Sequence, residues 1–374
     1  MKYFIFLITN LLLLNVLVNG AFQTSIFRET NNDFPGQNVC ISPLSMFQVL
    51  GLTTNGAKGV TQDEMVSALE ATSLENLNTI NLNLLQIIKH FETVEMANAV
   101  MTRFDPTKMF LKVCIKYEAP IEPLISVEQV NEWCAEKTHG KIINILDELN
   151  PATVMLLLNA VYFKAEWQYQ FNPAYTYTGV FTYDPNIRGG TKEVQFMTQT
   201  QNFNYYEDKS VQVVELPYKN DSMSAIVILP NEQTDLNTYL KSLDDEVLNT
   251  LLAGLSSIRV KLSLPKFEIE FKNKFKDILK RLGMIQAFGG NADFSGIKCS
   301  GGICINDVIH KTYLKVDENG SEAAAVTVVD MKFTSVKPTT TVTMNVNRPF
   351  IFLLRSTQLP KNNDLLFMAK VVNI

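Results

Sequence analysis

Residues 316–349 read VDENGSEAAAVTVVDMKFTSVKPTTTVTMNVNRP, and the first part of this stretch decides how the chain folds. From Ser321 to Val329 it contains no Gly or Pro and ends in β-branched residues, a composition that suits a strand. With a period of two, one face of that strand carries Ser321, Ala323, Ala325, Thr327 and Val329. Such small side chains would let the segment enter between packed strands without overpacking. The same composition suits a surface loop, and spacing alone does not decide between the two.

This stretch resembles the hinge and reactive-centre loop of the serpins, a family of serine protease inhibitors. The resemblance implies an exposed bait loop at about residues 318–345. After cleavage, its first part would insert into a sheet and carry the acylated protease along. The implied hinge residues are Glu318, Gly320, Ser321, Glu322, Ala323, Ala324 and Ala325. The resemblance runs from about residue 22 to residue 374.

The resemblance also implies the fold class. Strands and helices mix along the chain without a regular βαβ repeat, which favours an α+β domain. Serpins have a large, mostly antiparallel central sheet, further sheets, about eight or nine helices and an exposed reactive-centre loop. We therefore expect residues 21–374 to form one serpin domain.

Composition limits the classes of partner. Of 374 residues, 46% are hydrophobic and 19% are charged, which gives ample material for a core and argues against global disorder. The formal net charge is -5, and no long run of Lys or Arg occurs. Neither nucleic acid nor a strongly anionic membrane surface is therefore expected as a partner.

The first twenty residues, MKYFIFLITNLLLLNVLVNG, place Lys2 before an apolar run and small residues after it. This pattern is typical of a cleaved secretory signal at residues 1–20 and predicts a secreted, extracellular protein. A membrane anchor is the alternative, although Asn10 and Asn15 make the run impure for a spanning helix. In a secreted glycoprotein, Asn220 in the sequon NDS is the candidate acceptor.

The cysteines are odd in number and too few for a disulfide framework: Cys40, Cys114, Cys134, Cys299 and Cys304. Only the last two lie close together, and the glycines between them would permit a small bridged loop. Free thiols are the alternative. A metal site that combines these two with His310 matches no standard zinc spacing, so we expect no metal and no cofactor.

Local patterns predict several elements. Ser42 before Pro43 predicts a capped helix, and Thr61 with Glu64 predicts a capping box at the following helix. Residues 235–255 predict one amphipathic helical insert. The run NPATVMLLLNAVYFKAEW at residues 150–167 is apolar on both faces, which is typical of a central strand in a covered sheet. The C-terminal segment predicts two buried strands.

Two polar sites follow from the resemblance. His310 is similar to the serpin shutter histidine, which bonds an Asn on the neighbouring strand, here Asn159, with Ser42 and Ser45 below. The alternative is an ordinary hydrogen-bonded core histidine. If the shutter exists, breaking its buried network should loosen the sheet.

The second polar site, the breach, would bring Glu318 and Lys266 together near Trp167 at the top of the sheet. Partial burial would then help the pair to hold the loop outside. The alternative is two solvated charges that contribute about 0–1 kcal/mol if they pair at all.

An enzyme is not expected, because the chain contains no GxSxG, HExxH, GxxxxGK[ST] or GxGxxG motif. A triad hydrolase needs a nucleophile clustered with a histidine and an acid. Only His90, His139 and His310 could act as a base, and the first two lie in exposed helical contexts.

Two functional hypotheses remain. The first is a monomeric suicide inhibitor of serine endopeptidases, favoured because residues 321–329 contain no bulky, charged or Pro insertion on the small face. The second is a non-inhibitory serpin that acts as a carrier, chaperone or storage protein. Heparin is not expected as an activator, because the region that is basic in heparin-binding serpins offers only Lys89 and His90.

Serpin spacing places the reactive bond sixteen residues after Glu318, between Thr334 and Ser335, which suggests an elastase-like enzyme. Cleavage after Phe333 would suit a chymotrypsin-like enzyme, and cleavage after Lys332 a trypsin-like one. Since a protease pocket selects mainly by its fit to this side chain, the target class stays open.

Overall fold

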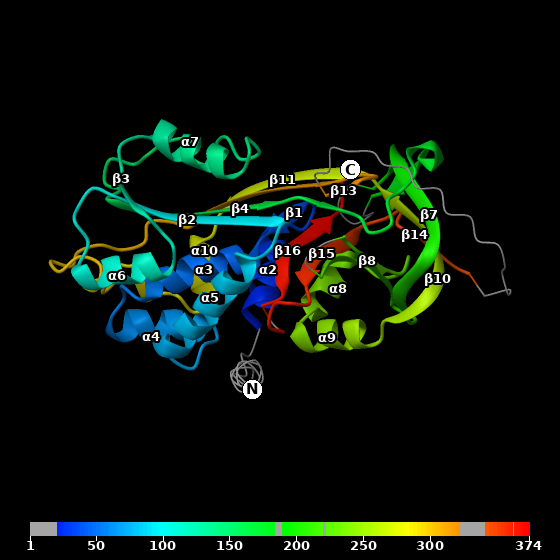
Figure 1. Ribbon diagram of the computed structural model, residues 1–374. Helices are drawn as coiled ribbons and strands as arrows, with labels where there is room; N and C mark the ends of the chain where they lie inside the picture. Colours follow the sequence, from blue (N-terminus) through cyan, green and yellow to red (C-terminus); the bar gives the residue numbers. More distant parts are fainter. Residues whose placement is uncertain (1–20, 184–188, 220–221, 322–340, 362) are drawn as a thin grey trace, which may run out of the picture.

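The computed structural model describes residues 21–183, 189–219, 222–321, 341–361 and 363–374 (Figure 1). The expected leader, the Asn220 sequon, hinge residues 322–325 and the expected reactive bond at residues 332–335 lie outside these ranges. The described residues include nine α-helices and sixteen strands.

The helices are α2 (Ala21–Asp33), α3 (Pro43–Thr54), α4 (Gly59–Ala68), α5 (Leu74–Ile88), α6 (Lys108–Lys116), α7 (Val127–Lys137), α8 (Leu236–Ser242), α9 (Asp245–Ala253) and α10 (Lys276–Arg281). The strands are β1 (Val39–Ile41), β2 (Val94–Thr102), β3 (Ile121–Pro123), β4 (Met155–Phe163), β5 (Ala165–Glu166), β6 (Tyr177–Thr182), β7 (Thr191–Glu207), β8 (Val211–Pro217), β9 (Met223–Pro230), β10 (Ser256–Pro265), β11 (Phe267–Lys274), β12 (Ile309–Val316), β13 (Gly320–Ser321), β14 (Val342–Asn345), β15 (Phe350–Ser356) and β16 (Leu365–Val371).

The largest sheet has nine strands in the order β1-β16-β15-β9-β8-β7-β10-β14, with β6 also paired to β7. All strand pairs of this sheet are antiparallel except β10 with β14, which agrees with the expected large, mostly antiparallel sheet. The two C-terminal strands pair with each other beside the edge strand β1, with Phe350 opposite Val371. Every residue of β9 and β16 is buried, which confirms the expected buried tail and places the main core at this sheet.

Three smaller sheets form a second layer: β3-β2-β4, β11-β12 and the short pair β13-β5. Helix α3 packs on β4, and α5 packs on β2. Helix α7 lies on the opposite side of β2 and β4 from these two helices (Figure 1). The smaller sheets therefore lie between a helical layer and a single covering helix.

Three local predictions can be compared with these elements. Ser42 does cap α3, since its Oγ accepts a hydrogen bond from the backbone N–H of Ser45. The capping box at Thr61 is wrong: α4 begins at Gly59, before that residue. Thr61 instead accepts from the N–H of Asp293, 3.0 Å away, so a distant loop has taken the hydroxyl that a local cap would use.

The predicted insert at residues 235–255 is two helices, not one. Leu243, between α8 and α9, has an extended backbone, and Asp244 then accepts a hydrogen bond from the N–H of Val247. A new N-cap starts the second helix because a side-chain carboxylate satisfies one of its free backbone donors. Amphipathic spacing does not reveal such a break, because both helices bury large apolar residues, mainly leucine, at helical spacing.

All five cysteines lie in the described ranges, and none forms a disulfide. Cys299 and Cys304 are exposed as free thiols, while the other three are buried. The structure thus adopts the free-thiol alternative for the close pair. Among the described residues, no helix has the length and apolarity to cross a bilayer.

Candidate functional site

The candidate site is the interval between the facing edges of β4 and β12, which we call the seam. On one side β4 pairs with β2, and on the other β12 pairs with β11. In the described part of the chain no ladder joins β4 to β12. Both strands therefore present an edge of backbone donors and acceptors toward the seam.

The exposure of β4 corrects the sequence expectation. Its apolar run predicted burial on both faces, yet six of its nine residues are half-buried. By contrast, β9, which has strands on both sides, is buried throughout. The missing burial has a physical reason: β4 has the composition of a central strand but stands at the edge of its small sheet.

Two hinge residues close the upper end of the seam. Gly320 pairs with Glu166 and Ser321 with Ala165, so β13 runs antiparallel to β5. A tight turn makes this possible, because the N–H of Asp317 donates to the carbonyl of Gly320 at 3.0 Å. A Cβ on Gly320 would lie 2.0 Å from the carbonyl oxygen of Ala165, so only glycine fits here.

The side chain of Ser321 points into the core. The residue is fully buried, and its hydroxyl lies 2.7 Å from the hydroxyl of Tyr218. The Tyr218 ring stacks on Trp167 at 4.4 Å between centroids and meets Phe163 edge-on. Burial raises the pKa of the Tyr218 phenol, so the pair is a neutral hydrogen bond inside an aromatic cluster.

The breach residues do come together. Lys266 Nζ lies 2.9 Å from Glu318 Oε2, and Thr176 donates to the other carboxylate oxygen at 2.8 Å. Burial would raise the pKa of Glu318, but the hydrogen bonds from Lys266, the backbone and Thr176 outweigh it and hold the pKa below its usual value. Glu318 is therefore charged and anchored on both oxygens.

Trp167 holds the hinge backbone directly. Its indole Nε1 donates to the carbonyl of Asp317, and its own N–H donates to the carbonyl of Asn319, both at 2.9 Å. The N–H of Phe171 donates to the carbonyl of Glu318 at 3.0 Å. Three consecutive hinge carbonyls are thus bound from one segment, so the hinge begins in a fixed position.

The shutter residues gather below the seam, but with other partners than expected. His310 does not contact Asn159 directly; its Nε2 accepts a hydrogen bond from the backbone N–H of Ser42 at 2.9 Å. Asn159 Oδ1 accepts from the Ser45 hydroxyl, and its Nδ2 donates to Asn98 at 2.7 Å. The first turn of α3 therefore bridges the two sides of the seam.

His310 is neutral in this position. Burial lowers the pKa of its imidazole to about 4, and the ring meets Phe275 edge-on at 5.6 Å. The acceptor role of Nε2 toward Ser42 also requires an unprotonated nitrogen. Protonation would convert that acceptor into a donor facing an N–H group.

Residues 138–149, which we call the strap, cross the seam after α7. On the β2–β4 side, Ile142, Ile145 and Leu146 join α7 in a separate apolar cluster with those strands. On the other side, Lys272 of β11 binds Asp147 at 2.8 Å, and the Lys141 ammonium lies 4.9 Å from the centroid of the Tyr313 ring on β12. The strap thus covers the seam and is attached on both sides.

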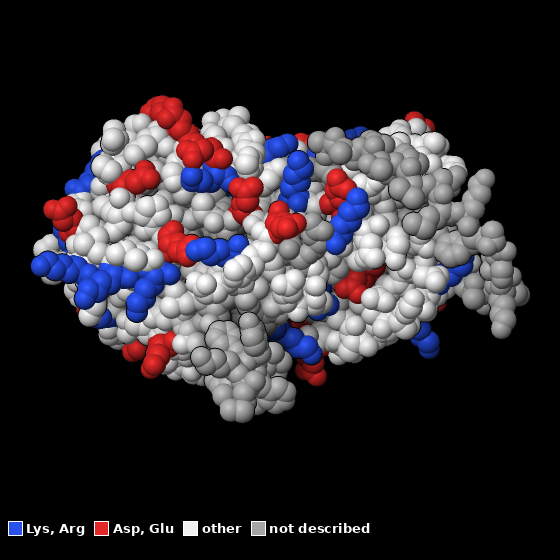
Figure 2. Space-filling model, in the orientation of Figure 1, with Lys and Arg blue, Asp and Glu red and all other residues white. Residues whose placement is uncertain are grey.

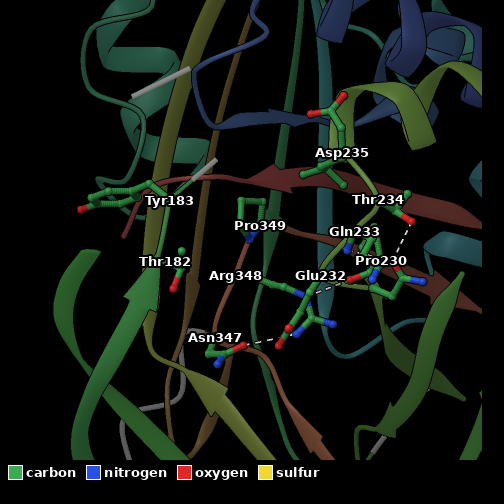
Figure 3. Close-up of a pocket in the computed structure, with 12 residues that line it drawn as sticks. Thr182, Tyr183, Pro230, Glu232, Gln233, Thr234, Asp235, Asn347, Arg348 and Pro349 are labelled. Carbon is green, nitrogen blue, oxygen red and sulfur yellow. Dashed lines mark hydrogen bonds between the residues drawn. The ribbon is translucent and has the colours of Figure 1, made fainter. Parts of the chain in front are cut away.

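A separate hollow lies at the other sheet. Its volume is about 470 Å³, and it lies between the ends of β6 and β9 and the segment before β15. Figure 3 shows Glu232 and Arg348 close together in it. Arg348 is positioned by donation to the carbonyl of Pro230 at 2.9 Å. Apolar surface comes from Tyr183, Leu236 and Pro349.

Sequence reasoning missed several residues of the site. Tyr218, Thr176 and Asn98 each bind an expected residue, but they lie 61 to 142 positions away along the chain. No local pattern indicates such a partner, because the fold alone brings it close. The strap contacts of Lys141 and Lys272 were missed for the same reason.

In the part of the chain that the structure describes, a sheet edge without a partner strand ends at an anchored hinge, and this arrangement fits the serpin class that the sequence resembles. The family model for the serpins, described as "Serpin (serine protease inhibitor)", matches residues 17–374. This chain therefore belongs to the serpin family.

Individual relatives and solved structures also match nearly the whole chain. Iripin-5 of Ixodes ricinus is 30% identical over 377 residues, covering 95% of this chain and 93% of its own. The structure of Tengpin, a thermophilic serpin in the native state, matches with a TM-score of 0.86 and 32% identity, covering 95% of this chain and 93% of that one. A complex of thyroxine-binding globulin with thyroxine matches with a TM-score of 0.84 and 25% identity, covering 95% and 98%.

The neutral His310 predicts an acid-sensitive shutter. The folded pKa of about 4 lies below the ordinary 6.5, so the unfolded state binds a proton that the folded state refuses. Stability is thus complete above pH 6.5 and falls by roughly 3 kcal/mol as the pH drops toward 4. The measurement is the denaturant unfolding midpoint from pH 7.5 to 4, compared with His310→Gln, which retains an acceptor. Parallel curves for both proteins would contradict the prediction.

The strap contacts predict a measurable opening. In the double variant Lys141→Ala/Lys272→Ala, one cation–π contact and one ion pair are lost, so strap amides should exchange with solvent about fivefold faster. Hydrogen exchange of residues 138–149 followed by mass spectrometry measures this. Lys261→Ala, on β10 of the large sheet, is the control. An unchanged exchange rate would show that Lys141 and Lys272 do not hold the strap, and that α7 and the contact from Lys311 to the Asn144 carbonyl are sufficient.

Proposed function

We propose that this serpin is a secreted suicide inhibitor of serine endopeptidases. The observation that carries the proposal is the combination of an unpaired seam with a hinge that has already entered it by two residues. A chain held in this way can gain a complete strand, whereas an ordinary loop above a closed sheet cannot. Insertion would satisfy the backbone groups on both edges of the seam.

The register of β13 supports this reading. Since Ser321 pairs with Ala165, a strand continued in the same register would run down β4 antiparallel to it. Ser321 points inward, so with a period of two the next inward residues would be Ala323, Ala325 and Thr327. These are small, and the layer below the seam could receive them without overpacking.

The mechanism then has three parts. A protease serine attacks the carbonyl of the bait residue, the peptide bond breaks, and the released amine takes a proton, which leaves an ester between the enzyme and this chain. The freed upstream segment enters the seam, starting from Ser321. The ester-linked enzyme is carried along before water can hydrolyse the bond.

The proposal also includes the secretory leader, the glycosylation site and the reactive bond. Residues 1–20 direct secretion, Asn220 carries a glycan, and the reactive bond joins Thr334 to Ser335, with Phe333 or Lys332 as the alternative residue before the bond. The leader pattern and the serpin spacing support them. No cofactor takes part, and the inhibitor acts without heparin and as a monomer.

A panel of enzymes tests the inhibitory activity. The protein is incubated with elastase-, chymotrypsin- and trypsin-like proteases and run on denaturing gels. We expect a covalent band of summed mass with at least one enzyme, a released C-terminal fragment beginning at Ser335, and greater heat resistance of the cleaved chain. Cleavage by all three without a covalent band or a gain in heat resistance would remove the proposal.

The buried position of Ser321 gives a sharper test. Ser321→Arg places a large charged side chain in the buried position where the hydroxyl meets Tyr218, so the hinge should not enter the seam. We expect this variant to be cleaved as a substrate, with covalent complex reduced at least tenfold on gels. Ser321→Ala, which removes only the hydroxyl, should still form complex. Normal complex formation by the Arg variant would contradict the role of the hinge.

A carrier is the second candidate, favoured by the likeness to thyroxine-binding globulin and by the hollow in Figure 3. An amino-acid ligand such as thyroxine offers a carboxylate to Arg348 and an ammonium group to Glu232. Equilibrium dialysis with thyroxine tests this, and Glu232→Ala should weaken binding if the hollow is used. Retention no greater than for an unrelated protein would dismiss the carrier.

A further inference from the structure

Helix α6 carries an outward face that neither the fold nor the seam uses. Phe110 and Cys114, each 1% exposed, pack inward and fix the orientation of the helix. Lys108, Lys112 and Lys116 follow at intervals of four residues, so they form one row on the opposite side. All three lysines are exposed.

The charge of the lysine row is not neutralised by ion pairs in the described part of the chain. No carboxylate among the described residues lies within ion-pair distance of these three ammonium groups, although Asp105 lies exposed just before the helix. Glu118, just after the helix, is taken by Lys89 at 2.7 Å. Figure 2 shows Lys and Arg side chains gathered at the end of the molecule where Figure 1 places α6.

A neighbouring loop extends the row. The N–H of Thr107 donates to the carbonyl of Ile297 at 2.8 Å, and its hydroxyl donates to the carbonyl of Gly296 at 2.5 Å. This holds the loop beside the start of α6, where Lys298 lies 5.4 Å from the centroid of the Phe104 ring. The cationic surface is therefore built from two segments that are fixed to each other.

Large apolar side chains flank the lysines. Ile115 is 76% exposed, Met109 71% and Leu111 36%, although each lies on a helix that buries other apolar residues well. On the helical wheel, Met109 lies on one side of the lysine row, and Ile115 and Leu111 lie on the other. Exposed apolar residues on both sides of a cationic row are therefore available to a partner outside the domain.

From this arrangement we infer that α6 docks the protein on an anionic lipid surface. A membrane interface accepts both components, because lipid headgroups attract the ammonium groups while the acyl boundary buries Ile115 and Met109. A linear sulfated polysaccharide would pair with the lysines but leave the apolar side chains in water. The net charge of -5 and the lack of a basic run predicted no anionic membrane partner, but screening limits each charge to about 10 Å, so the row acts locally.

The face, which comprises Lys108, Met109, Lys112, Ile115 and Lys116, works independently of the seam. It lies on a helix that supplies no hinge, shutter or strap residue. The binding surface and the proposed inhibitor function can therefore fail separately, and a protein that inhibits nothing could still bind lipid through this face.

Vesicle co-sedimentation of the mature chain tests the inference. The probes are vesicles of phosphatidylcholine alone and of phosphatidylcholine mixed with phosphatidylserine. We expect binding to the mixed vesicles only, weakened by salt. Each lysine should contribute about fivefold to the partition coefficient. The partition coefficient should therefore fall at least about 100-fold in Lys108→Glu/Lys112→Glu/Lys116→Glu and about fivefold in Lys112→Gln.

Two matched variants make the test specific. Lys209→Glu/Lys241→Glu/Lys261→Glu changes net charge equally with exposed lysines on other elements, and should bind as the wild type does. Met109→Ser/Ile115→Ser should weaken binding while leaving the charge unchanged. Equal melting curves confirm that the variants are folded.

Three results would overturn the inference. These are equal binding to both kinds of vesicle, equal loss in the two triple variants, or retention on immobilised heparin that depends on the lysines while phosphatidylserine vesicles go unbound.

Discussion

The structure depends on one constraint: the edges of β4 and β12 face each other, and no strand of the described part of the chain pairs with both of them. Unpaired backbone groups at such edges are a liability that proteins normally cover or pair. Here β13 pairs only two residues at one end, α3 bridges the shutter below, and the strap covers the outside. Each of these contacts stabilises the open arrangement without filling it, so the fold holds a state in which one more strand would add hydrogen bonds.

The polar contacts around the seam differ between its two ends. Ser42 and Ser45 connect His310 and Asn159 through the first turn of α3, so the strands can separate there only if one of these hydrogen bonds breaks. At the upper end the contacts are stronger and of a different kind. Glu318 is held by Lys266 and Thr176 at the point where the chain leaves β12, so this end of the seam is anchored through both carboxylate oxygens.

The serpin fold could be expected from the resemblance carried by residues 316–349, and the two buried C-terminal strands from their apolar composition, which is a local property. The family resemblance brought together Glu318, Lys266 and Trp167, but the bond it implied between His310 and Asn159 is replaced by contacts to Ser42 and Ser45. Local patterns could not supply partners chosen by the fold, such as Tyr218 for Ser321 or Asp293 for Thr61. Local patterns also predicted too much burial for β4. An apolar run shows that a strand can be buried on both faces, but it does not show whether a neighbouring strand is there to bury it.

The turn that joins β12 to β13 has a further consequence. Because side chains alternate strictly along a strand, the pairing of Gly320 with Glu166 sets the phase for every residue that could follow. For the insertion proposed above, one residue added to or removed from this turn would exchange the two faces, directing Glu322 inward and the small residues outward. The turn can therefore vary in sequence only while the parity of its length is kept.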